Sequence, residues 1–412
     1  MFKIAHTILV LTAACATGQT LLSPQEAVEL ALKSHPLLNA SSARSDAAAG
    51  RLQQAGLRPN PRFSWQSENW RLNGNPAFRP GTDTDQFALL TQPLETGGKR
   101  ARRMELARAG AQQTELERAV LARQIGLRVQ QAYWNAAGAE KVHQLLAENA
   151  ANFQQIVEYH EARVRLGAMA EADLLKVQLE RERLEVSIRS AALDVDRTRI
   201  ALFREMGLNE YPVVKLADLP GEVTGTAIDT DFRTASGNRV DLKLARQAVE
   251  RARAYVKVEQ ANAKPEVDFV VGYKRTSGFN TLVGGVQVNL PLSNRNQGSI
   301  AAAGSEVRVM EWELASAEAA AKAEIRTAAA EVTSRREQLQ QVFGAADGGG
   351  LRGKASESSR IAQAAYREGG TDLLRLLDAE RSRIEVQVLY FKMLADYRQS
   401  VAALEAAVGL NP

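Results

Sequence analysis

Residues 366–379 of the chain read YREGGTDLLRLLDA. A long helical run that is rich in alanine and charge meets Gly369 and Gly370, which end or turn a helix because glycine adopts positive φ at little cost. Thr371 or Asp372 can then cap a new helix that begins LLRLL. The stretch therefore predicts a helical hairpin whose turn lies at the two glycines.

The same pattern occurs once before, where residues 163–177 read RVRLGAMAEADLLKV. A shift of about 200 residues places Gly167 on Gly369 and continues without a gap to the Gly-Leu pairs at 207–208 and 409–410. Chance pairing of two unrelated helical hairpins is the alternative. An ungapped match over this length favours two copies of one unit.

The composition is that of a folded, helix-rich protein. Of 412 residues, 45% are apolar and 24% are charged, which argues against disorder. The 52 Lys and Arg are interspersed with 48 Asp and Glu, so the chain builds no basic face. We therefore expect no nucleic-acid partner.

The first 18 residues have the layout of a secretory signal peptide, with Lys3, an apolar core over residues 8–11 and then small residues. Cys15 also fits the position of a lipidated cysteine, so removal and lipidation both stay open. It is the only cysteine, which excludes a disulfide framework. Since no later run reaches 18 apolar residues, insertion into a membrane is expected to use strands.

Four segments read as strands, at about residues 62–72, 86–94, 266–275 and 282–292. Each is about ten residues long, enough to cross a bilayer when tilted. In the last pair one side is apolar and the other is polar, which fits a transmembrane barrel wall and also a half-buried soluble sheet. The apolar side consists of Val267, Phe269, Val271, Tyr273, Leu282, Val286, Val288 and Leu290.

The chain divides into a first repeat at residues 19–208, a linking segment at 209–238 and a second repeat at 239–412. Residues 99–165 contain no proline, and residues 174–206 place apolar side chains alternately three and four apart, which predicts coiled-coil packing. Residues 344–350 interrupt the second long helix with four glycines and are expected to form a surface excursion.

A signal peptide followed by two copies of helix, strand, strand, long helix, turn and long helix resembles the TolC-type outer-membrane efflux factors. The most specific residues are Tyr366, Gly369 and the Leu-Asp-Ala run at 377–379, with Gly167 and Asp173 in the first copy. Residues 94–100, LETGGKR, are similar to the corresponding segment of the heavy-metal (cobalt, zinc, cadmium) branch.

The resemblance implies a mainly helical α+β fold in which a homotrimer forms a 12-stranded transmembrane β-barrel, continued by a periplasmic α-helical coiled-coil barrel. Four strands alone cannot close a barrel in lipid, so the strands agree with this assembly. The implied function is the exit duct of a tripartite efflux system. It conducts substrates passively, heavy-metal cations among them, from an inner-membrane pump and a periplasmic adaptor across the outer membrane.

The resemblance also implies a gate at the periplasmic tip, where Asp173 and Tyr366 match family positions that hydrogen-bond between neighbouring coiled coils. Thr371 stands where the archetype has an arginine of this lock. Of two aspartates at the archetype's constriction, Asp378 is retained and the other is Arg375, so pairing at i, i+3 is expected to lower cation selectivity. Asp173 could equally cap its helix, and Tyr366 could be an ordinary packing residue.

Other chemistry is scarce, and we expect neither an enzyme nor a cofactor. His35, His143 and His160 are isolated in the sequence, without metal-ligand spacing, and no nucleophile or phosphate-binding motif is evident. The competing interpretation is an exported periplasmic coiled-coil scaffold or adaptor without a pore.

Overall fold

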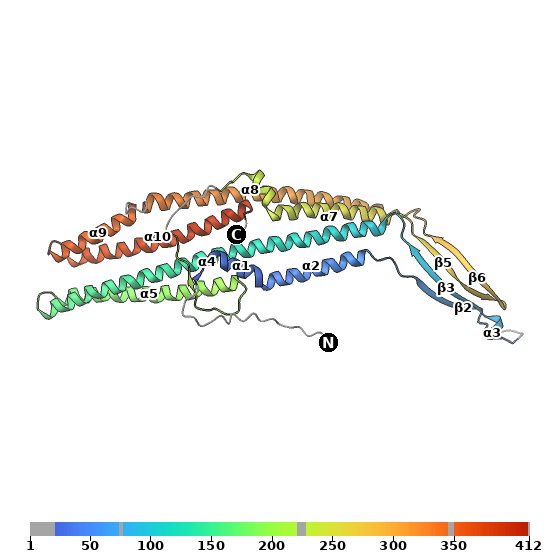
Figure 1. The fold of residues 1–412 in the computed structure, drawn as a ribbon, viewed down its shortest axis with the longest axis horizontal. Helices are drawn as coiled ribbons and strands as arrows, with labels where there is room; N and C mark the ends of the chain where they lie inside the picture. Colours follow the sequence, from blue (N-terminus) through green and yellow to red (C-terminus); the bar gives the residue numbers. More distant parts are fainter. Residues whose placement is uncertain (1–20, 74–76, 221–227, 345–349, 411–412) are drawn as a thin grey trace. The chain divides into compact units, whose positions relative to one another are not determined.

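The structure is a computed structural model that describes residues 21–73, 77–220, 228–344 and 350–410 (Figure 1). The predicted signal peptide and Cys15 lie outside these residues. Along the chain the elements are β1 (Leu21–Leu22), α1 (Pro24–Ser34), α2 (Pro36–Ala55), β2 (Arg62–Glu68), α3 (Pro80–Asp83), β3 (Asp85–Leu94), α4 (Lys99–Arg165), α5 (Glu171–Glu205), β4 (Lys215–Leu216), α6 (Phe232–Asn238), α7 (Val240–Asn262), β5 (Val267–Thr276), β6 (Phe279–Val288), α8 (Gln297–Phe343), α9 (Gly350–Arg367) and α10 (Leu373–Val408).

The chain forms two compact units, and each contains segments from both halves of the sequence. The hairpin unit comprises the described residues within 1–33, 125–225 and 333–402. The sheet unit comprises those within 34–124, 226–332 and 403–412. Residues 345–349, within the predicted surface excursion, lie outside the described residues, and α8 and α9 stand on either side of them.

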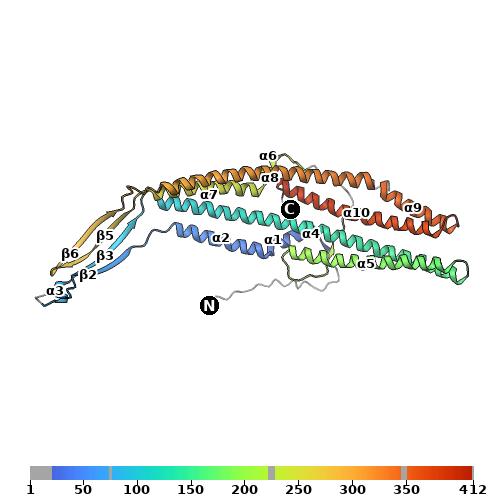
Figure 2. The same cartoon turned by 180° about the vertical axis from the view of Figure 1, so that it is seen from behind.

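In the hairpin unit, α5 packs as its heptad predicts. Val177, Leu184 and Ala191 are buried, and they join a core to which α4 and α10 contribute. The turn between α4 and α5 and the turn between α9 and α10 lie at the same end of this unit in both views (Figure 1 and Figure 2). The predicted coiled-coil hairpins are therefore confirmed.

The helices of the two copies end in the same way at equivalent glycines. Gly167 and Gly369 have φ of 68° and 76°, and their N–H groups donate to the carbonyls of Val164 and Tyr366. The next residue in each case donates to the carbonyl five residues before it, which completes a Schellman motif. Gly370 therefore does not adopt positive φ, contrary to prediction, because one left-handed residue suffices to end the helix.

The sheet unit holds a four-stranded antiparallel sheet in the order β2-β3-β5-β6, so the two copies meet where β3 pairs with β5. Leu90 pairs with Val271 in this central ladder. Away from the sheet, in the same unit, α6, α8 and α10 enclose a small core (Figure 1). It consists of Ala235, Ile325, Ala328, Leu404, Ala407 and Val408.

Three strand ends differ from prediction. β2 ends at Glu68 and not near 72, because Asn69 adopts a left-handed conformation with φ of 62°. β6 begins at Phe279 and not near 282, since Ser277 and Gly278 both have positive φ and form a two-residue hairpin turn. Its pairing stops at Val288, three residues before Pro291.

One face of the sheet is apolar across all four strands. The pairing register places Phe63, Leu90, Val271 and their neighbours two residues along on the same face, and these side chains are largely exposed. The other face is mixed, with polar ends and a middle row of Leu89, Gly272 and Val283. The exposed apolar set is Phe63, Trp65, Leu90, Phe269, Val271, Tyr273, Leu282, Val286 and Val288.

The segment predicted as a linker at 209–238 contains β4 and α6, and β4 pairs in parallel with β1. Tyr133 of α4 fastens this pair, because its hydroxyl donates to the Leu22 carbonyl at 2.7 Å and accepts from the Ala217 N–H at 2.8 Å. Among the helices of the described residues, none is both long and apolar enough to cross a membrane.

Candidate gate at the hairpin turns

Asp173 lies in the first turn of α5, within the predicted tip. The helix begins at Glu171 after Ala170, so Asp173 is not its N-cap as the alternative interpretation held. Its carboxylate instead pairs with Lys176 at 3.1 Å. In the second copy Asp372 does cap α10, since its side chain accepts from the N–H of Arg375 at 2.9 Å. The two turns are thus equivalent in backbone but differ in capping.

Tyr366 bonds to a residue that the sequence did not single out. Its hydroxyl lies 2.8 Å from Nε2 of His160, and the two rings are stacked with centroids 5.5 Å apart. His160 is 0% exposed, near the end of α4, and its Nδ1 lies 2.6 Å from the Ile156 carbonyl. This pair joins the α4–α5 hairpin to the α9–α10 hairpin.

The surroundings of Tyr366 favour its neutral hydroxyl. Burial is the largest influence and raises the pKa of Tyr366 above its usual range. The positive charge of Arg163 acts in the opposite direction, while Tyr159 and the Asp173 carboxylate raise the pKa further. Asp173 is therefore close enough to act on Tyr366, although the hydroxyl bonds to His160.

Thr371, Arg375 and Asp378 line a groove of about 870 Å³ between α9 and α10. Arg375 and Asp378 are both exposed, and among the described ion pairs none joins them. The expected i, i+3 pair is therefore not formed, which is reasonable because an exposed pair gains little over hydration and restricts two side chains. Their gating and selectivity roles stay predictions.

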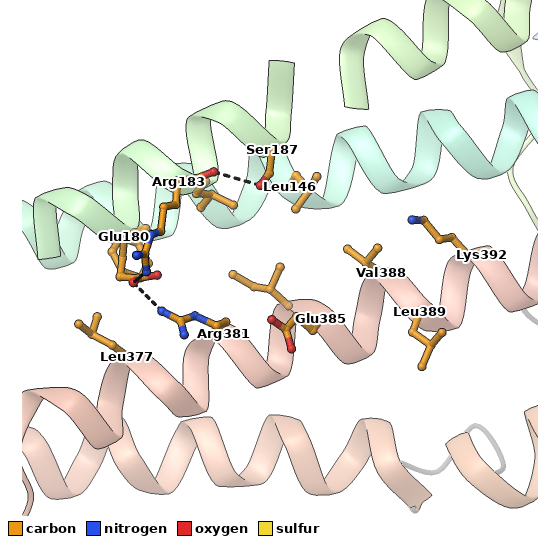
Figure 3. A pocket seen from close by; sticks show the side chains of 13 residues that line it. Leu146, Glu180, Arg183, Ser187, Leu377, Arg381, Glu385, Val388, Leu389 and Lys392 are labelled. Atoms are coloured by element: carbon orange, nitrogen blue, oxygen red, sulfur yellow. Dashed lines mark hydrogen bonds and ion pairs between the residues drawn. The ribbon is translucent and has the colours of Figure 1, made fainter. Parts of the chain in front are cut away.

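A second contact between the hairpins runs from α5 to α10. The Glu180 carboxylate accepts from Arg183 of its own helix and from Arg381 of α10 (Figure 3). These side chains border a cavity of about 510 Å³ that Leu146, Leu377 and Val388 also line. Below the tip, the hairpins are thus joined by a shared carboxylate beside apolar packing.

A third contact is a buried polar network. Arg383 of α10 donates to both Asn149 of α4 and Glu380, and Glu380 also accepts from Ser359 and Gln363 of α9. Burial by itself raises the pKa of Glu380, but these hydrogen bonds and the Arg383 charge outweigh burial and hold it below its usual range. The carboxylate is therefore ionised and paired.

Sequence reasoning missed the residues of these contacts other than Tyr366, among them His160, Asn149 and Glu380. One signal was present for His160, since it lies seven residues before Gly167 and Tyr366 lies three before Gly369. Both are hence within the last two turns of helices that end at equivalent glycines. Which helix faces which is not encoded in that spacing.

A mainly helical chain with paired long hairpins and a four-stranded sheet of exposed apolar face defines a class, the outer-membrane efflux channels. Comparison with known proteins agrees. The model of the outer membrane efflux protein family matches residues 27–208 and 232–410, so the chain belongs to that family. The predicted mainly helical α+β fold of a TolC-type outer-membrane efflux duct that extends into the periplasm is thereby confirmed.

Among curated relatives, the cobalt-zinc-cadmium resistance protein CzcC of Cupriavidus metallidurans is 22% identical over 94% of this chain and 90% of its own length. The nickel-cobalt-cadmium resistance protein NccC of Alcaligenes xylosoxydans is 26% identical over 73% of this chain and 68% of its own. Among solved structures, the CusC channel superposes with a TM-score of 0.76 at 17% identity, covering 98% of this chain and 96% of that one.

Proposed function

We propose that three copies of this chain form the exit duct of a tripartite efflux system. The duct conducts substrate passively across the outer membrane from an inner-membrane pump and a periplasmic adaptor. The observation that carries the proposal is the sheet, which has one exposed apolar face and two open edges at β2 and β6. Lipid accommodates the apolar face, but it does not tolerate open edges.

Joining copies edge to edge solves the problem of the open edges. If β6 of one copy pairs with β2 of the next, three copies supply twelve strands and close a barrel. The apolar set then faces outer-membrane lipid on every strand. The mixed face, with Ser64, Gln66, Lys274 and Thr281 among its members, lines the interior.

The helices support the same assembly. α5 carries a second apolar stripe at Leu175, Leu179, Val186, Leu193 and Ile200, and these side chains are between 48% and 68% exposed. The repeat offset places the same stripe of α10 at residues 377–402, where Leu377, Ala395 and Ala402 are buried. Since the second copy is covered at these three positions, a neighbouring chain that covers the first copy's stripe would continue the ring.

Heavy-metal cations are the substrate class we propose. Support comes from the similarity to CzcC and NccC, whose names state resistance to cobalt, cadmium and related metals. Within the described residues, no group of three or more His, Cys, Asp or Glu is arranged to hold a metal ion. If heavy-metal cations leave the cell through this duct, deleting the gene should sensitise its host to cobalt, zinc or cadmium. Sensitivity to organic drugs alone would reject the metal substrate.

The barrel is tested with a pair of charge substitutions on adjacent residues of β5. Val271→Asp places a carboxylate on the apolar face, which is unfavourable at mid-membrane, although it costs less than the roughly 2–4 kcal/mol of an Arg or Lys on a lipid-facing strand. Val270→Asp places it on the opposite face, beside Thr91 and Gly285 in the register. We expect only Val271→Asp to reduce outer-membrane fractionation and the amount of trimer on native gels.

Equal behaviour of the two variants would contradict the barrel. If both remain trimeric in the outer membrane, the apolar face does not meet lipid, and the pore-free coiled-coil scaffold becomes the better interpretation. If both are lost, charge anywhere in the sheet is disruptive, and the assignment of faces is wrong.

A further inference from the structure

We propose that His160 is the fastener of the periplasmic tip, holding Tyr366 and thereby locking the two hairpins of one protomer together. The proposal rests on the duct function, because a tip lock has meaning only where the tip gates a pore. Neither the sequence match nor the relatives assign a role to His160. The structure places it at the contact between α4 and α9.

The hydrogen-bond directions around His160 are determined by its partners. A carbonyl oxygen can only accept, so the Nδ1 atom, 2.6 Å from the Ile156 carbonyl, carries a proton. The ring is fully buried, and both of its nitrogens have a partner among the described residues. Nε2 then accepts, and the Tyr366 hydroxyl donates to it across 2.8 Å.

The charged and titratable groups around the His160–Tyr366 bond have partners of their own. The titratable or charged groups near it are Tyr159 and Arg163 on α4 and Asp173 on α5. Arg163 donates to the Tyr159 hydroxyl, and Asp173 pairs with Lys176. Each has a partner of its own, so among the described residues the hydrogen bond that joins the hairpins at this turn is the one from Tyr366 to His160.

A ring of three chains contains two kinds of contact between hairpins, one within a protomer and one between protomers. The bond from Tyr366 to His160 belongs to the first kind. The repeat offset places Ala362 at the position of His160 and Val164 at the position of Tyr366. In a ring of three chains, the contact between protomers would therefore bring together two side chains that cannot hydrogen-bond. At this level the hydrogen-bonded tie therefore lies within each protomer, and opening that moves one hairpin of a protomer away from the other must break it.

The bond from Tyr366 to His160 also replaces an interaction that this chain lacks. Thr371 occupies the position where the resemblance implied an arginine of the lock, and it offers no charge. The bond between fully buried His160 and half-buried Tyr366 supplies a tie at the same turn, since Tyr366 lies five residues before Thr371.

Single-channel recording of the full-length protein in planar bilayers tests the proposal. His160→Phe and Tyr366→Phe each keep a ring and remove the bond, and we expect open probability to rise about fivefold, the effect of one typical hydrogen bond. The double variant should match the single variants, because all three lack the same bond. His160→Gln, which can still accept from the hydroxyl, should restore the wild-type value.

His143→Phe is the matched control, since it changes a histidine of the same helix that lies away from Tyr366, and it should leave gating unchanged. Amide hydrogen exchange at residues 156–166 and 362–370 gives a second measurement, which should accelerate in His160→Phe and not in His160→Gln. Wild-type gating and exchange in His160→Phe would reject the proposed role of His160. Additive effects of the two Phe substitutions would reject it as well. A wild-type protein that forms no channel would instead reject the duct, and with it this proposal.

Discussion

Gly138 of α4 lies directly against Ala395 of α10, so that a Cβ added at Gly138 would come within 2.7 Å of the Ala395 Cβ. Real side chains do not approach so closely, and neither methyl group could rotate away. The absence of a side chain at position 138 therefore sets the distance between α4 and α10 within the hairpin unit.

Gly138→Ala should destabilise the protein. Alanine favours a helix by about 1 kcal/mol over glycine, but overpacking costs about 1–3 kcal/mol and outweighs this gain. Gly110→Ala is the control on the same helix, because its nearest neighbour is the Arg251 Nε at 4.0 Å, and it should be neutral or stabilising. Thermal melting followed by circular dichroism distinguishes the two. A Gly138→Ala protein as stable as wild type would show that the two helices separate freely.

Tyr133→Phe should destabilise the hairpin unit by about 1–3 kcal/mol, since it leaves the Leu22 carbonyl and the Ala217 N–H without their partner. Tyr211→Phe changes an exposed tyrosine and is the control. Chemical denaturation of the two variants measures the difference. If Tyr133→Phe unfolds like Tyr211→Phe, water replaces the hydroxyl at no cost.

Tyr133 also makes stability depend on alkaline pH. Burial is the main cause that raises its pKa from 10.0 to about 12, so the folded state holds the proton more tightly than the unfolded state. The corresponding stability is complete below pH 10 and is lost as the pH rises toward 12. Melting temperatures measured across that range should fall less steeply for Tyr133→Phe than for wild type. Parallel slopes would mean that Tyr133 does not contribute to the decline.

Glu380 gives the opposite dependence at acid pH. Because its pKa is lowered in the folded state, its contribution is present above the unfolded value, about 4.3, and is lost as the pH falls further. Glu380→Gln should lower stability at pH 7 by about 2 kcal/mol, through loss of a charge-assisted bond with Arg383. Glu357→Gln is the control, because it removes an exposed ion pair with Arg360 on α9. The difference from wild type should shrink steadily as the pH falls below the unfolded value, and a difference that stays constant down to the acid unfolding transition would reject the ionic contribution.

The sequence was sufficient to predict the features that depend on local conformation or period. The turns at Gly167 and Gly369 follow from glycine's freedom at positive φ, and α4 matches its predicted bounds of 99 and 165 because no proline interrupts it. The apolar face at Val271 and Leu282 follows from strict alternation. Each of these can be read without knowing which element is the neighbour.

Features that need the neighbour were not predicted. His160 and Tyr366 are 206 residues apart, and Asn149 and Arg383 are 234 apart, so their meeting depends on how the two hairpins lie against each other. The strand end at Glu68 was missed for a local reason, since Asn69 adopts a left-handed conformation that its sequence permits without requiring.

The charges beside the groove at the tip give the last prediction. Arg375 and Asp378 are both exposed and unpaired with each other in the described structure, so in a trimer each would present its own charge to solvent. Arg375→Asp would give carboxylates at both positions and should shift the reversal potential in a KCl gradient toward cation selectivity. Arg375→Gln, which only removes the positive charge, should shift it by about half as much. An unchanged reversal potential in both variants would place these side chains away from the ion path, because a charge that ions pass alters their selectivity at low salt.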